Sequence, residues 1–105
     1  MTMPRAYANQ AEFGAAVSEI ERQFQPQIIY IRYSFGNDWT GEPSVFFRVL
    51  LSDEASRIER LRRISVQFED AIEEQLEPRE RWGVLPYFNY RSASEQQVIQ
   101  EEAWA

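Results

Sequence analysis

The sequence predicts an α+β fold, with a small antiparallel or mixed sheet of three strands and two main helices on one of its faces. Two segments repeat apolar residues at helical spacing, and three shorter segments consist of aliphatic and aromatic residues typical of strands. We expect the order helix, strand, strand, helix, strand and a short terminal helix, within a single domain over residues 1–105.

The first helix is predicted over residues 10–24. Its apolar residues fall at i, i+4, i+7 and i+11 and form one stripe: Phe13, Val17, Ile20 and Phe24. Asn9 and Glu12 fit a capping box at its start, and Pro26 ends it. Residues 1–8 are expected to be flexible.

Two strands follow, over residues 27–35 and 44–51, and each alternates between two faces. The expected core-facing residues are Ile29, Ile31, Tyr33 and Phe35 in the first strand, and Val45, Phe47, Val49 and Leu51 in the second. The loop FGNDWTGEP (residues 35–43) joins the strands most simply as a hairpin. We expect Gly36 and Gly41 to supply positive φ in this loop.

A long helix is predicted within residues 51–78, capped by Ser52 or Asp53 and ended by Pro78. Its expected core face follows a spacing of three and four: Ala55, Ile58, Leu61, Ser65, Phe68, Ile72 and Leu76. A third strand covers residues 84–90, where Pro86 places it at an edge. Residues 92–105 then form a terminal helix or tail, opened by a capping box from Ser92 to Glu95.

A right-handed crossover through the long helix would make the third strand parallel to the second. We expect it to lie beside the first strand, in the spatial order 2-1-3. The order of elements is that of a ferredoxin-like β-α-β-β-α-β plan without its first strand, although this comparison does not predict a function. One sheet face or edge is left exposed, and proteins tend to cover such surfaces.

Composition excludes several classes of protein. There is no cysteine and no histidine, which removes disulfides, thiol nucleophiles and the usual general base near neutral pH. The net charge of -6 opposes binding to nucleic acid or to an anionic membrane. The apolar runs are too short for a transmembrane helix and no signal sequence is evident, so we expect a cytoplasmic protein.

Few residues suggest chemistry. Glycine-rich phosphate loops are absent, and the serines have no histidine or lysine to activate them. Asp38 and Glu42 share the hairpin loop and could serve a small carboxylate-dependent enzyme or hold a cation. The turn alone explains most of this loop, so we expect no enzyme, no catalytic residue, no metal site and no cofactor.

The hairpin contains the first group of candidate partner-binding residues. Trp39 either folds back onto the sheet, which we favour, or contacts a partner as an interface anchor. If paired residues sum to 80, Arg32 lies opposite Arg48 and the two like charges need an acid, an anion or a partner nearby. Tyr30 and Phe46 share that sheet face, and Tyr87 is expected to join them. Arginine beside aromatic residues also resembles a surface for single-stranded RNA or a nucleotide.

The long helix contains the second group. Its first half is basic, with Arg57, Arg60 and Arg63, and its second half is acidic, with Glu73 and Glu77. Two antiparallel copies would place unlike charges together, or the charges are simply solvated and screened by Arg79 and Arg81.

The functional expectation is a small non-enzymatic protein-interaction domain. It would act as a homodimer or as an accessory subunit of a larger complex, and its acidity and size also suit an antitoxin-like or immunity role. Binding of single-stranded RNA or a nucleotide, and a small carboxylate-dependent enzyme, are the alternatives.

Overall fold

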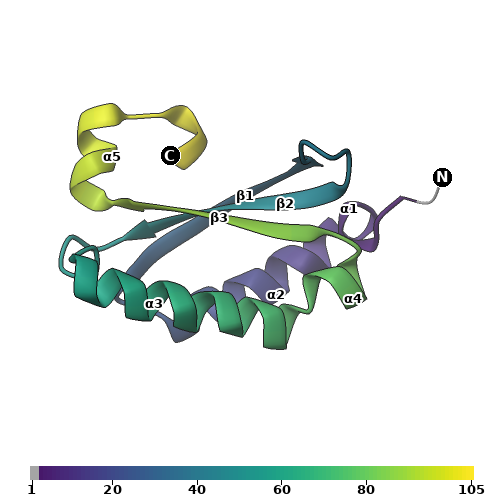
Figure 1. Cartoon of the computed structure of the whole chain (residues 1–105), viewed down its shortest axis with the longest axis horizontal. Helices are drawn as coiled ribbons and strands as arrows, with labels where there is room; N and C mark the ends of the chain where they lie inside the picture. Colours follow the sequence, from purple (N-terminus) through teal and green to yellow (C-terminus); the bar gives the residue numbers. More distant parts are fainter. Residues whose placement is uncertain (1–2) are drawn as a thin grey trace.

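The chain folds as a mixed α+β unit with an open sheet of three strands, as seen in a computed structural model that describes residues 3–105. Helices α2 and α3 lie on one face of the sheet, and α5 and the C-terminal residues lie on the other (Figure 1). The elements are α1 (Arg5–Ala8), α2 (Gln10–Gln23), β1 (Ile28–Asn37), β2 (Pro43–Leu51), α3 (Ile58–Ala71), a π-helical turn (Ile72–Leu76), α4 (Pro78–Trp82), β3 (Leu85–Ser92), α5 (Ala93–Ile99) and a 3₁₀ turn (Glu102–Trp104). The predicted fold class and order of elements are confirmed.

The hairpin register is as predicted, but the strand order is not. β1 and β2 are antiparallel with Arg32 opposite Arg48, whereas β3 pairs in parallel with β2 and gives the order β1-β2-β3. The predicted order 2-1-3 is therefore wrong. β2 is the most deeply buried strand, and the central position covers both of its edges. Phe88 of β3 stacks on Phe47 of β2, with ring centroids 5.5 Å apart.

The core lies between the sheet and the two long helices. The predicted α2 stripe is confirmed, with Phe13, Val17 and Ile20 buried and Phe24 partly buried. Phe13 meets Trp82 of α4 edge to face at 5.3 Å, so the helical layer is joined by aromatic contacts as well as aliphatic ones.

The start of β1 departs from simple alternation. The register shifts between Ile28 and Tyr30, and this bulge buries Ile28 while it leaves Ile29 exposed. The prediction that Ile29 faces the core is therefore wrong, because one extra residue in a strand reverses the side chains that precede it.

The predicted long helix begins later than expected. It ends before Pro78 as predicted, because the π-helical turn after α3 stops at Leu76 and Glu77 adopts a left-handed φ of 51°. α3 begins at Ile58, which is 68% exposed, and Ile64 rather than Ser65 faces the core. Ser52 does accept the Ala55 N–H at 3.2 Å, but within a turn that precedes the helix. Pro78 occupies the first turn of α4, where a proline needs no hydrogen-bond donor.

The N-terminal segment is ordered differently from the prediction. Residues 5–8 form α1, with Ala6 fully buried; residues 1 and 2 lie outside the described part of the chain. Asn9 makes no cap to α2, and its amide instead donates to the Arg5 carbonyl at 3.2 Å. The predicted capping box from Asn9 to Glu12 is wrong, because the turn of α1 already occupies the chain before α2.

The box from Ser92 to Glu95 at the start of α5 is confirmed. Across residues 3–105, none of the helices has both the length and the apolar character needed to cross a bilayer.

Candidate functional site

The sheet face opposite α2 and α3 carries the largest group of candidate residues. β1 and β2 bring Tyr30, Arg32, Phe46 and Arg48 together, as predicted. β3 adds Tyr87, which lies in register with Phe46, and it also adds Arg91. We call this surface the open face.

Asp38 organises the hairpin turn at one end of the open face. Its Oδ1 atom accepts the Thr40 N–H at 2.9 Å, the Thr40 hydroxyl at 2.6 Å and the Glu42 N–H at 3.0 Å. Its Oδ2 atom accepts the Tyr87 hydroxyl at 2.7 Å. Bonds from Thr40, then Tyr87, lower the Asp38 pKa to about 2, because they stabilise the ionised form.

These contacts account for the conformation of the turn. Both carboxylate oxygens of Asp38 are engaged, and Glu42 contributes its main-chain groups to the same turn. Gly41 has φ of 89°, as predicted. The prediction of positive φ for Gly36 is wrong, because this residue continues β1 opposite Ser44.

Trp39 stands at the tip of this turn and is 82% exposed. Its ring lies 5.6 Å from that of Tyr87, and Tyr87 stacks on Phe46 at 5.5 Å with an interplanar angle of 17°. We call Trp39, Tyr87 and Phe46 the aromatic row. The favoured prediction that Trp39 folds back onto the sheet is wrong, since its ring contacts Tyr87 of β3 but remains open to solvent.

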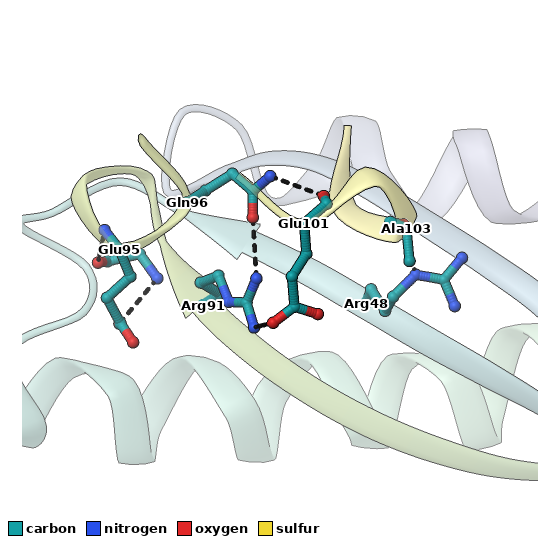
Figure 2. A network of polar contacts seen from close by, with 7 residues as sticks. Arg48, Arg91, Glu95, Gln96, Glu101 and Ala103 are labelled. Carbon is teal, nitrogen blue, oxygen red and sulfur yellow. Dashed lines mark hydrogen bonds and ion pairs between the residues drawn. The ribbon is translucent and has the colours of Figure 1, made fainter. Parts of the chain in front are cut away.

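The other half of the open face is occupied by the chain's own C-terminal residues. Arg48 Nε donates to the Ala103 carbonyl at 2.7 Å (Figure 2), and Arg32 Nε donates to the main-chain oxygen of Ala105 at 3.1 Å. The Tyr30 hydroxyl donates to the carbonyl of Trp104 between them. Main-chain oxygens thus accept from both of the opposed arginines.

Arg91 is the residue of this site that the sequence analysis missed. Its guanidinium donates to Gln96 at 2.9 Å and pairs with Glu101 at 3.0 Å (Figure 2). It also lies 4.5 Å from the centre of the Trp104 ring. The Arg91 side chain is 14% exposed and Trp104 is 6% exposed. Arg91 lies four residues after Tyr87 in β3, so strand alternation could have placed it on the open face. No pattern in the sequence near Trp104 predicts that this residue docks there.

Three charges of the predicted long helix, those of Arg60, Glu73 and Glu77, are paired within the chain. Glu73 pairs with Arg79 at 3.0 Å, and Glu77 pairs with Arg81 at 3.8 Å. At the basic end Arg60 pairs with Glu54 at 2.5 Å, whereas Arg57 and Arg63 have no ion pair within residues 3–105. These exposed pairs contribute little stability, but they reduce the charge that a second copy would meet.

No metal centre is apparent in the described residues. Nowhere in residues 3–105 do three acidic side chains gather closely enough to hold a metal ion, and the chain has no histidine or cysteine to replace them. A groove of about 570 Å³ lies at the start of α3. Arg60 and Arg63 contribute to its wall, and the Arg60 charge is already met by Glu54.

Comparisons with known proteins find no matching family model, no similar curated protein and no similar solved structure.

Proposed function

We propose that this chain is a non-enzymatic protein-interaction domain, and that it binds its partner through the aromatic row. The partner is either a second copy or a larger protein of which the chain is an accessory subunit. The observation that supports this most directly is the 82% exposure of Trp39 on a turn that is held in place.

The geometry of the turn favours binding. Asp38 fixes the backbone on either side of Trp39 and anchors it to β3 through Tyr87. A tryptophan presented in this way loses little conformational freedom when a partner covers it. Tryptophan and tyrosine are also the residues that most often dominate the energy of protein interfaces.

The two alternatives receive less support. Single-stranded RNA would need the arginines of the open face, but Arg32 and Arg48 already donate to the C-terminal residues. A carboxylate enzyme would use Asp38 and Glu42 together, but Asp38 already accepts four hydrogen bonds, which leaves Glu42 without an acidic co-worker.

The test compares Trp39→Ala with Ile58→Ala, a matched removal of an exposed apolar side chain from the start of α3. Light scattering over a range of concentrations measures self-association, and affinity capture from the native host measures a partner. We expect Trp39→Ala to lose the dimer or the captured protein and Ile58→Ala to keep it. A monomer that captures nothing, or equal binding by both variants, would contradict the proposal.

A further inference from the structure

We propose that the half of the open face formed by Tyr30, Arg32, Arg48 and Arg91 is a second binding site, for a short acidic-aromatic peptide of a partner protein. The residues Glu101 to Ala105, which we call the C-terminal segment, occupy that site and hold it closed. The inference rests on the proposed role in protein interaction, but its evidence comes from the other half of the face.

The contacts separate into two kinds. Tyr30, Arg32 and Arg48 donate to three consecutive main-chain oxygens, those of residues 103–105. Such bonds hold any peptide backbone of suitable shape and do not read its sequence. This part of the site therefore supplies affinity.

Arg91 supplies selectivity. It forms an ion pair with Glu101 and lies over the ring of Trp104, three residues further along. A guanidinium can recognise a carboxylate and an aromatic face at the same time. The ligand that fits this geometry carries an acid and, three residues later, a tryptophan or a similar aromatic residue.

Few buried side chains hold the C-terminal segment on the sheet, so it can detach from the open face. α5 has no buried residue, and its apolar side chains Val98 and Ile99 are exposed. After Ser92, Trp104 is the only buried side chain. A region with so few buried contacts opens locally at a much lower cost than the whole domain.

Gln100 provides the hinge. It joins α5 to the C-terminal segment with φ of 53°, a left-handed conformation that a non-glycine residue adopts only at some cost. Proline cannot adopt this conformation because its ring fixes φ near −65°. Gln100→Pro should therefore release the segment without touching the sheet.

The stability of the closed state determines how much peptide affinity is gained when the C-terminal segment is released. A tethered segment competes at an effective concentration in the millimolar range, and an external peptide binds in proportion to the fraction of open protein. We expect the opened protein to bind the peptide at least ~10-fold more tightly than the unaltered chain.

The experiment uses the full chain and a labelled synthetic peptide of sequence QEEAWA. We expect Gln100→Pro to bind it at least ~10-fold more tightly than either the unaltered chain or Gln100→Gly, which keeps the left-handed turn. Adding Arg91→Ala, or replacing the peptide's tryptophan by alanine, should remove the gain. Trp104→Ala opens the segment by a second route and should show the same gain.

Amide exchange should show an intact sheet and a released segment in both opened variants. If neither of them then binds the peptide better than the unaltered chain, the inference is overturned. Binding of a single-stranded oligouridine in place of the peptide would also overturn it and would indicate a nucleic-acid site. Trp39→Ala should leave peptide binding unchanged, so this site and the aromatic row can fail independently.

Discussion

Tyr87 and Asp38 meet across 49 positions of sequence, where the tyrosine hydroxyl donates to the Asp38 carboxylate at 2.7 Å. This contact ties the hairpin turn to β3 and fixes the base from which Trp39 projects. It also makes the turn sensitive to acid, because only the ionised carboxylate accepts all four of its bonds.

The first prediction concerns this acid sensitivity. The folded-state pKa of Asp38 is lowered to about 2, below the unfolded value. Ionised Asp38 therefore stabilises the fold above about pH 4, and the contribution is lost as the pH falls towards 2. Denaturant unfolding at several pH values measures this contribution. Between pH 4 and 2, the free energy of unfolding of Asp38→Asn should fall less than that of the unaltered chain. Asp70→Asn, on the exposed side of α3, is the control, and an equal change in both variants would disprove the assignment.

The second prediction compares two buried tryptophans. Trp82 packs against Phe13 within the core cluster, so Trp82→Ala should cost about 3–5 kcal/mol of unfolding free energy. Trp104 lies outside that cluster, within the C-terminal segment that we propose to detach, and its replacement by alanine should cost much less. Thermal or chemical unfolding measures both. Equal losses would mean that the C-terminal segment belongs to the cooperative core.

The third prediction concerns Tyr90, whose hydroxyl donates to Glu69 at 2.6 Å between β3 and α3. Burial, and then this bond, raises the pKa of Tyr90 above its usual range. The protonated tyrosine therefore stabilises the fold below about pH 10, and stability falls as the pH rises above that value.

Tyr90→Phe tests this contribution. It should cost about 1 kcal/mol at neutral pH, because Glu69 loses its donor. It should also lose less stability than the unaltered chain above pH 10. An unchanged alkaline unfolding profile would show that Tyr90 does not control it.

The fourth prediction separates two glycines. Gly83 ends α4 with φ of 70°, so Gly83→Ala should cost about 1–2 kcal/mol. Gly36 lies in β1, where an added Cβ would meet Phe46 at an ordinary 3.5 Å. Gly36→Ala should be neutral or stabilising, since alanine loses less backbone freedom than glycine on folding. Unfolding midpoints of the two variants check this, and a reversed order would refute it.

The sequence by itself determined the elements and the hairpin. Apolar spacing marks α2 over 14 residues and β2 over 9 residues, and the short loop makes Arg32 face Arg48. These features depend on neighbours along the chain, so their pattern is visible in the sequence. The same reasoning failed at Ile29 and Ile58, where a bulge and a late helix start changed the periodicity.

Tertiary structure alone decided the strand order and the occupancy of the open face. β3 pairs with β2, which carries the most buried side chains of the three strands, and the choice of neighbour depends on the packing of the whole core. Tyr30 meets Trp104 across 74 positions, and Arg91 reaches Glu101 and Trp104 only after the C-terminal segment turns back. Contacts of this kind have no periodic signature, because each partner's position is set by the packing of the elements between them.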